Sequence, residues 1–334
     1  MWSTPVSRHC APKKLAIVGL GHVSGPQLAA IAQLRFWQLV AVADSDGRKR
    51  SACPGDTPFF LRVEEMLDQI SADLVVVATP TPTHYSIGIE VLSRGFNLLI
   101  EKPCCSTISE FDSLVQAAKE SRRLFHVAFH STFARDLAWY LRQSRIRAWG
   151  NPTTILCRFL DPYVASDGSI PNAPSLVSAW MDSGVNALAV IGRLLGDADV
   201  QVSRAEFVHH KETGDVVQAE VQLDAASVHG PTRLKIETDW LRGINSKSTL
   251  MNFDRYDTQV LLDHSDESAS CYQGGRLVRR VSLRNNRSRL QNHYIGVFQD
   301  AFEALERGKS NAAFARSIHK LLFDAQSIAL RGCV

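Results

Sequence analysis

Short apolar runs alternate with longer amphipathic segments along residues 13–127 of this 334-residue chain. The short runs are dense in aliphatic residues, which is typical of strands that are buried on both faces. Strands of this kind, separated by helices, form a parallel sheet that is wrapped by helices. We therefore predict a doubly wound α/β domain. Its strands contain KLAIVGLG, FWQLVAVAD, ADLVVVATP and NLLIEKP, and its helices contain PQLAAIAQL, RVEEMLDQI, YSIGIEVLSRG and ISEFDSLVQAAKESR.

The pattern changes after residue 128, where several long stretches alternate apolar with polar residues. Alternation with a period of two predicts an open, mainly antiparallel sheet with one solvated face. We expect two domains, residues 13–128 and 129–334, with the last helix able to pack back on the first domain. The strands predicted in the second domain are 153–160, 199–210, 216–226, 232–241, 257–264 and 276–283, and the helices are 135–144, 182–196, 294–308 and 314–330.

Composition excludes several classes of protein. The formal charge is +3 and the basic residues are scattered, so we expect neither nucleic acid nor a membrane as a partner. Seven cysteines without CxxC spacing argue against a disulfide framework and a metal site, and predict reduced thiols. No apolar run approaches the roughly 20 residues that span a bilayer, and no leader pattern opens the chain, so we expect a cytoplasmic protein.

A glycine loop follows the first predicted strand. Gly19 and Gly21 stand where the strand ends and a helix opens, and a backbone without side chains there can approach a pyrophosphate closely. The third glycine of the GxGxxG pattern is displaced, since Ser24 holds its place and Gly25 follows. A tight turn is the alternative interpretation. Asp44, at the end of the second strand, stands where a carboxylate accepts hydrogen bonds from a ribose, so the combination favours a dinucleotide.

The acid at position 44 favours NAD, because a carboxylate repels the additional phosphate of NADP. The basic run Arg48–Arg50 acts in the opposite direction, although such runs are commonly a solvated helix face. We predict NAD as the cofactor, with NADP possible.

Lys102 follows the buried strand of LLIEKPCCST, and ligands of open α/β sheets bind beyond the carboxyl ends of the strands. The alternative is that the lysine only marks where the strand meets water. Cys104 and Cys105 are weaker candidates, since a free cysteine is commonly a small buried hydrophobe.

Three polar residues share one face of the predicted helix 182–196. Asp182, Asn186 and Arg193 stand at i, i+4 and i+11, opposite an apolar face. A polar stripe on such a helix indicates a site. The alternative is structural: Asp182 caps the helix and the amide of Asn186 satisfies nearby backbone.

Several motifs occur in the order typical of one enzyme family. They are the glycine loop with its acid, TPTPTH, EKP, AFHSTF, MDSGVNALAVIGRLLG and YIGVFQDAFEALERG. With them the chain resembles the Gfo/Idh/MocA oxidoreductases over nearly its whole length. The resemblance implies a Rossmann domain, a C-terminal α/β domain whose open sheet forms homo-oligomer contacts in a dimer or tetramer, and hydride transfer between NAD(P) and a carbon of a sugar or cyclitol.

The resemblance also implies roles for particular residues. Lys102 corresponds to the active-site lysine, Asp182 to the acid of the DxGxH motif, and Asn186 to its histidine. The predicted catalytic residues are Lys102, Asp182 and Asn186. The predicted cofactor-binding residues are Gly19, Gly21, His22, Val23, Asp44, Thr79, Pro80, His84, Glu101 and Lys102. The predicted substrate-binding residues are Lys102, His130, Asp161, Asp182, Asn186 and Trp240, the last as an apolar face for a sugar ring.

Asn186 departs from the family pattern, because an amide cannot exchange a proton near neutral pH. The branch of L-arabinose and D-galactose 1-dehydrogenases resembles this chain in that feature, and an anomeric hydroxyl needs less basic help. We therefore expect oxidation of an aldose at C1 to a lactone. The segment 161–182 lacks any histidine, which leaves the sugar open. Alternatives are oxidation of a ring hydroxyl in a cyclitol, amino sugar or nucleotide sugar, and a non-catalytic Gal80-like sensor.

Overall fold

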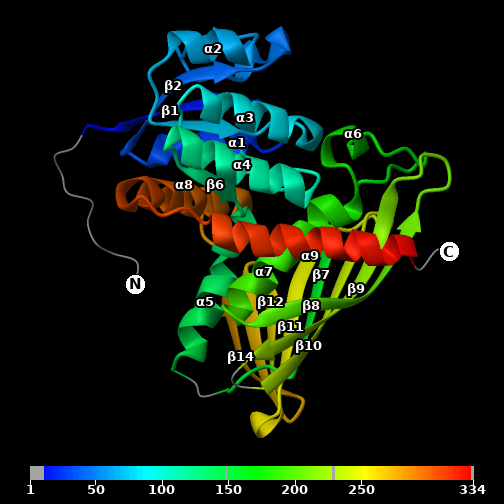
Figure 1. The fold of residues 1–334 in the computed structure, drawn as a ribbon. Coiled ribbons are helices and arrows are strands. Elements are labelled where there is room, and N and C mark those ends of the chain that lie inside the picture. Colours follow the sequence, from blue (N-terminus) through cyan, green and yellow to red (C-terminus); the bar gives the residue numbers. More distant parts are fainter. Residues whose placement is uncertain (1–10, 147–148, 228–229, 332–334) are drawn as a thin grey trace.

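A computed structural model describes residues 11–146, 149–227 and 230–331. The first half forms a six-stranded parallel sheet with the order β3-β2-β1-β4-β5-β6 (Figure 1). Its strands are β1 (Lys13–Val18), β2 (Trp37–Ala43), β3 (Phe59–Phe60), β4 (Leu74–Val77), β5 (Leu98–Glu101) and β6 (Phe125–Ala128). The helices beside it are α1 (Ser24–Gln33), α2 (Val63–Gln69), α3 (His84–Ser93) and α4 (Ile108–Ser121).

Successive residues of β1 face two different cores, which explains its dense apolar sequence. Leu15 and Ile17 pack with α1 and with α8 (Arg289–Arg307). Ala16 and Val18 pack in the core that contains α3 and α4. Helices therefore cover both faces of the sheet, and one of them comes from the far end of the chain.

The second half forms an eight-stranded sheet with the order β14-β13-β12-β11-β7-β10-β9-β8. Within it β7 and β10 run parallel, and the other pairs are antiparallel. Its strands are β7 (Thr154–Leu160), β8 (Asp199–His209), β9 (Val216–Ser227), β10 (Gly230–Asp239), β11 (Ser246–Phe253), β12 (Thr258–Asp263), β13 (Ser268–Gln273) and β14 (Arg276–Ser282). The predicted fold class is confirmed.

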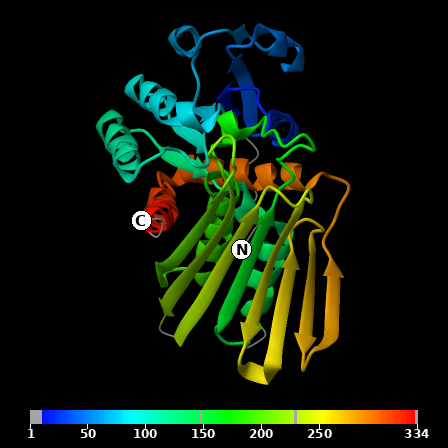
Figure 2. The same ribbon diagram turned by 90° about the vertical axis from the view of Figure 1, so that its right-hand side faces the viewer.

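Helices cover one face of this second sheet. They are α5 (Arg135–Ser144), α7 (Val185–Leu195) and α9 (Ala312–Arg331), which contact β12 and β13, β7, and β8 respectively. The opposite face is open in Figure 2. Ion pairs between Arg158 and Glu237 and between Lys235 and Glu220 join the strands. None of the helices in the described residues is long and apolar enough to cross a membrane.

The end of the chain holds the two halves together. Helix α8 packs on α1, and α9 packs on α4 and β6 as well as on α7. The division at residue 128 stays a prediction. Four strands, β3, β6, β11 and β13, were not predicted from the sequence. In the second sheet, β11 carries Lys247 and Thr249 at inward positions, and β13 consists largely of small residues.

Candidate active site

Lys102 and Asp182 form a buried ion pair between the two halves of the chain. Lys102 follows β5, and Asp182 lies in a π-helical turn, Trp180–Gly184, directly before α7. The Lys102 ammonium donates to Asp182 Oδ1 at 2.6 Å and to its main-chain oxygen at 3.1 Å. The two side chains are 8% and 12% exposed. The structure thus brings together two residues that are eighty positions apart in the sequence.

Asp182 is not a helix cap, so the structural alternative for this residue is wrong. Helix α7 has Gly184 as its N-cap and no side-chain cap. Asn186 donates from Nδ2 to the main-chain oxygen of Asp182 at 3.0 Å. Its Oδ1 atom is buried without a hydrogen-bond partner, which is costly unless a ligand donates to it. Arg193, expected on the same face, is exposed.

A second buried ion pair lies beside the first. Lys247 donates to Asp161 Oδ1 at 2.6 Å, while Asp161 Oδ2 accepts from Ser183, the neighbour of Asp182, at 2.7 Å. Burial lowers the pKa of Lys247, and the Asp161 carboxylate opposes that shift. Each oxygen of Asp161, a predicted hydroxyl ligand, thus accepts one side-chain hydrogen bond, and its contact with a substrate stays a prediction. Sequence reasoning missed Lys247, although a lysine at an inward position of an alternating strand is a signal.

His130 lies against His293, with their Nδ1 atoms 3.2 Å apart. Both rings are buried, and burial together with neighbouring positive charge lowers both pKa values, that of His293 to about 3. The charge of Lys102 contributes to the shift at His130. Two neutral imidazoles can share one proton across this contact. His293 was not predicted as part of the site.

Trp240 is completely buried, so the expectation that it offers an apolar face to a sugar ring is wrong. Its indole N–H donates to the Ser183 hydroxyl at 3.3 Å. Its ring meets Tyr163 edge-on, with centroids 5.2 Å apart. Trp240 therefore supports the turn that carries Asp182.

Arg289, the first residue of α8, was also missed from the sequence. It is half-buried, and within the described residues it has no hydrogen bond or ion pair. Burial lowers its pKa, while the charge of Asp161 opposes the shift. A half-buried guanidinium without a partner can bind an anionic group.

The glycine loop has the geometry of a dinucleotide cradle. Gly19 has φ +98°, and a Cβ there would lie 2.6 Å from the carbonyl oxygen of Ala78. His22 is exposed and Val23 half-exposed at the start of α1, which has no side-chain cap. Uncapped N–H groups of a first helical turn can receive a pyrophosphate. These residues fit NAD, with Gly21 in the same exposed turn.

Asp44 lies directly beneath this loop. Its Oδ2 atom accepts from the Leu20 N–H at 2.7 Å and from Lys49 at 3.0 Å, and its Oδ1 accepts from the Asp46 N–H. Burial opposes ionisation, but these donors together lower the pKa of Asp44. The carboxylate is thus ionised where the ribose is expected. Lys49 brings a cation to the same place, which keeps NADP possible.

The other predicted cofactor residues lie at or near the carboxyl ends of strands β4 and β5. His84 is buried, with one ring nitrogen 2.7 Å from the Thr79 carbonyl oxygen and the other 2.7 Å from that of Pro103. Glu101 accepts from Gln27 and Tyr294. His84 and Glu101 therefore position the segments that end in Thr79, Pro80 and Lys102. Direct contact of these residues with the cofactor stays a prediction.

Residues 13–129 match the sequence model of the Gfo/Idh/MocA family, an oxidoreductase family with an NAD-binding Rossmann fold. This chain carries a Gfo/Idh/MocA oxidoreductase domain. The match confirms the predicted family and the predicted NAD-binding fold for this domain. The prediction of an oxidoreductase agrees with the description of that family. Rhizopine catabolism protein MocA of Rhizobium meliloti is 25% identical over 145 residues, which cover 43% of this chain and 46% of that protein. The chain thus aligns with less than half of this relative.

Solved structures resemble the chain over almost its full length. GenD2 from gentamicin A biosynthesis, in complex with NAD, has a TM-score of 0.80 at 20% identity and covers 99% of this chain and 98% of that one. D-galactose-1-dehydrogenase from Rhizobium etli has a TM-score of 0.75 at 22% identity and covers 97% of each chain. At such identities the likeness shows that the chain shares their fold.

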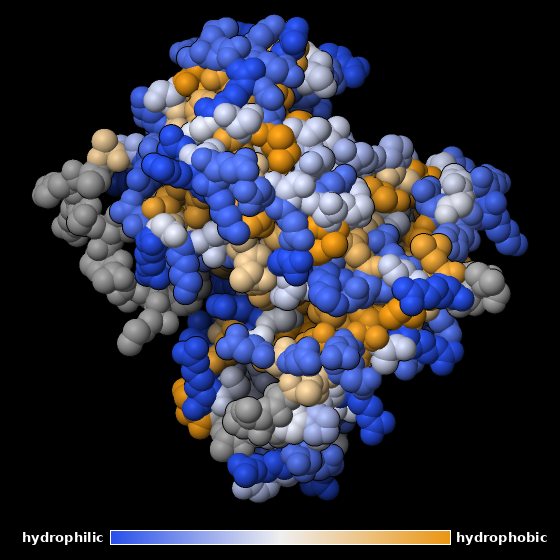
Figure 3. All heavy atoms as spheres, in the orientation of Figure 1, coloured by the Kyte–Doolittle hydropathy of each residue, from blue (hydrophilic) through white to orange (hydrophobic). Residues whose placement is uncertain are grey.

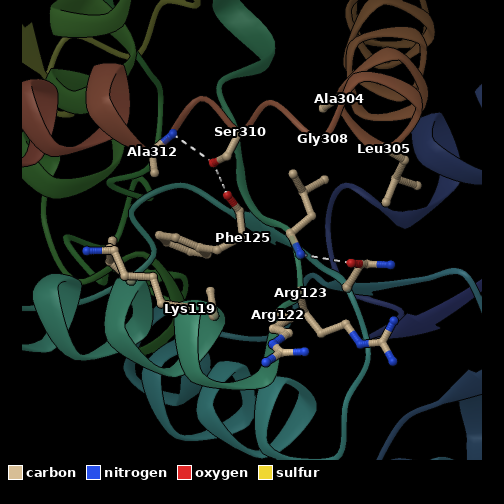
Figure 4. A pocket seen from close by; sticks show the side chains of 13 residues that line it. Lys119, Arg122, Arg123, Phe125, Ala304, Leu305, Gly308, Ser310 and Ala312 are labelled. Carbon is tan, nitrogen blue, oxygen red and sulfur yellow. Dashed lines mark hydrogen bonds between the residues drawn. The ribbon is translucent and has the colours of Figure 1, made fainter.

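A hollow lies between α4 and α8. Its volume is about 560 Å³, and Lys119, Arg122 and Arg123 line it (Figure 4). Ser310 in its wall donates to the Phe125 carbonyl oxygen. Neither Lys102 nor Asp182 lines the hollow, and its lining contains no acidic residue. The face shown in Figure 3 is mostly hydrophilic, with small apolar groups between the charged side chains.

Proposed function

We propose that this chain is an NAD(P)-dependent dehydrogenase that oxidises an aldose at C1 to the lactone. One observation carries the proposal: the buried Lys102–Asp182 ion pair stands next to the unsatisfied amide oxygen of Asn186, at the carboxyl end of the Rossmann sheet. This is where an open α/β sheet binds its ligands.

The chemistry requires that C1 lose a hydride and that its hydroxyl lose a proton. NAD, when held by the glycine loop, supplies the hydride acceptor. Asp182 and Lys102 receive the hydroxyl proton, because their shared hydrogen bond lets a proton move between a carboxylate oxygen and Nζ. The C1–O bond then becomes the carbonyl of the lactone, and the released proton leaves through the ion pair.

Asn186 holds the sugar and does not titrate. Its Nδ2 is occupied by Asp182, which leaves Oδ1 to accept from a sugar hydroxyl. An anomeric hydroxyl is more acidic than an ordinary alcohol, so an amide suffices where other members of the family use a histidine. The name of the structurally similar D-galactose-1-dehydrogenase supports this reaction class.

A second candidate reaction is oxidation of a ring hydroxyl in a cyclitol, amino sugar or nucleotide sugar. The observation in its favour is the His130–His293 contact, which places neutral imidazoles near Lys102. An imidazole there could accept the proton of a less acidic hydroxyl. The intact ion pair speaks against a non-catalytic sensor.

The test is a turnover panel with purified protein. Pentoses, hexoses, cyclitols and uronic acids are each supplied with NAD or NADP, and reduced cofactor is followed by absorbance. Uronic acids are included because Arg289 has no partner. The proposal expects turnover of at least one aldose with a lactone as product. Turnover of cyclitols alone would favour the second candidate, and cofactor binding without any turnover would favour the sensor.

We infer that the open face of the eight-stranded sheet joins copies of the chain. This face lacks a covering helix (Figure 2), and half-buried Leu156, Leu250 and Leu261 stand at its outward positions. Light scattering coupled to size-exclusion chromatography should give a dimer or tetramer. A monomer at micromolar concentration would contradict the inference.

A further inference from the structure

Two cysteines and a histidine lie together in the core, close in sequence to Lys102. Cys104 and Cys105 follow Pro103, and His319 lies in α9. Cys104 Sγ is 3.8 Å from Cys105 Sγ and 3.4 Å from His319 Nε2, and the three atoms lie within 4.8 Å of one another. The exposed fractions of Cys104, Cys105 and His319 are 0%, 1% and 0%. The active-site account assigns none of them a role.

The tautomer of His319 follows from its contacts. Nδ1 lies 2.8 Å from the Ala315 carbonyl oxygen, which can only accept, so Nδ1 carries the proton. Nε2 therefore carries the lone pair, which accepts from the Cys104 N–H at 3.1 Å, and it also lies 3.4 Å from Cys104 Sγ. A ligating histidine commonly has this arrangement, with its second nitrogen donating to a carbonyl.

The surroundings of the cluster are apolar. The rings of Phe111, Phe129 and Phe323 lie 5.2, 6.0 and 6.0 Å from the His319 ring. Burial first, and then the neighbouring Cys105, raises the pKa of the Cys104 thiol well above its usual value. Without a cation the Cys104 thiol is thus neutral. A bound cation would stabilise thiolates here, because opposite charge offsets the cost of burying them.

We propose that Cys104, Cys105 and His319 bind one thiophilic d¹⁰ cation, Zn²⁺ or Cu⁺. Ligands at about 2.3 Å for sulfur and about 2.0 Å for nitrogen, at near-tetrahedral angles, stand about 3.8 Å apart for two sulfurs and about 3.5 Å for sulfur and nitrogen. The separations of 3.8 and 3.4 Å match these values. Binding releases the thiol protons and exchanges the Cys104 N–H contact for a metal–nitrogen bond.

The cation would join two elements that are distant in sequence. The cysteines lie two and three residues after Lys102, and His319 is 215 positions after Cys104. The metal would therefore fasten the segment that carries Lys102 to α9. This inference does not depend on the proposed reaction, because the ligands are separate from Lys102 and Asp182.

Metal content tests the proposal directly. The full chain is purified under reducing conditions and analysed by elemental mass spectrometry, as isolated and after refolding with Zn²⁺ or Cu⁺. We expect about one metal per chain in the wild type. Cys105→Ser and His319→Gln should retain less than about a tenth of it. Cys157→Ser is the matched control, because Cys157 is also buried but its thiol hydrogen-bonds to the Thr249 hydroxyl, at 3.3 Å, and is not part of the Cys104–Cys105–His319 cluster.

Two results would overturn the site. One is a wild type that holds no stoichiometric metal in any preparation, and the other is full metal content in both ligand variants. If those variants fail to fold, the absorption spectrum of the wild type refolded with Co²⁺ tests the site without them. Thiolate-to-cobalt charge-transfer absorption that disappears on adding excess Zn²⁺ supports the site, and a spectrum without sulfur ligation contradicts it.

Discussion

The buried polar side chains of the candidate active site differ in whether another side chain satisfies their charge or hydrogen bonds. Lys102 and Asp182 satisfy each other, as do Lys247 and Asp161, so four charges are buried at moderate cost. The Asn186 amide oxygen has no partner in the described residues and is therefore the group that a substrate can satisfy. The sequence predicted Lys102 and Asp182 from their motifs. The inward position of Lys247 in an alternating strand was a signal, but its pairing with Asp161 depends on register across the sheet and could not be predicted.

We expect Asp44 to determine whether the protein prefers NAD or NADP. Asp44→Asn keeps an acceptor for the Leu20 N–H but removes the charge and frees Lys49 for a phosphate. We expect the preference for NAD over NADP to fall by about tenfold, since one charge contact changes by about 1.4 kcal/mol. Steady-state kinetics with both cofactors measure it. Asp46→Asn, at a more exposed acid that pairs with Arg48, should leave the ratio unchanged.

Among the elements, strands β1, β2, β4 and β5 were predictable because burial on both faces leaves an uninterrupted apolar run, whereas the short strands β3 and β6 were not predicted. Strand β11 was also not predicted, because its inward positions include Lys247 and Thr249. The Cys104–His319 contact could not be predicted either, because it depends on how α9 packs against α4 and β6. Trp240 was predicted to bind the sugar, but it packs in the core and supports the turn that carries Asp182. A tryptophan in the sequence is compatible with either role.

The turn between β1 and α1 requires glycine at position 19. Gly19→Ala would place a Cβ 2.6 Å from the Ala78 carbonyl oxygen at a φ of +98°. We expect a loss of about 1–3 kcal/mol in the free energy of unfolding and weaker binding of NAD. Urea denaturation and cofactor titration measure the two effects. Gly25→Ala is the control, because nothing lies within 4 Å of its added Cβ, and equal losses in both variants would refute the explanation.

Strand β11 supports the site through its ion pair. Lys247→Met leaves the Asp161 carboxylate buried without its cation, which should destabilise the chain by about 3–5 kcal/mol. The double variant with Asp161→Asn should recover a large part of that loss, because no uncompensated charge remains. Urea denaturation of the wild type, both single variants and the double variant gives the coupling. Additive losses would show that the pair is not coupled.

At the scale of the whole molecule, the last two helices make the two sheets one body. Helix α8 enters the first core through residues such as Tyr294 and Phe298, while α9 contacts both halves. The sequence indicated a helix that packs back on the first domain, but not that α8 completes its core. Because His293 on α8 is buried, the stability of this packing should depend on pH.

Acid should destabilise the chain through His293. Its pKa is about 3 in the folded protein and about 6.5 when unfolded, so between these values the unfolded state binds more protons. Stability is therefore lost as pH falls from about 6.5 toward 3, by up to about 1.4 kcal/mol per pH unit. Urea denaturation at several pH values should show a shallower loss for His293→Gln. The exposed His209→Gln is the control, and equal slopes in all three proteins would contradict the prediction.

The central claim is that Lys102 and Asp182 take the proton of the sugar hydroxyl. The most direct measurement is single-turnover reduction of NAD, with a sugar identified by the panel, by the wild type, Lys102→Met and the exposed-lysine control Lys119→Met. We expect Lys102→Met to slow the chemical step by about 10²–10⁴-fold with NAD affinity within a few fold of wild type, and Lys119→Met to react at the wild-type rate. A Lys102→Met protein that reduces NAD at the wild-type rate would contradict it.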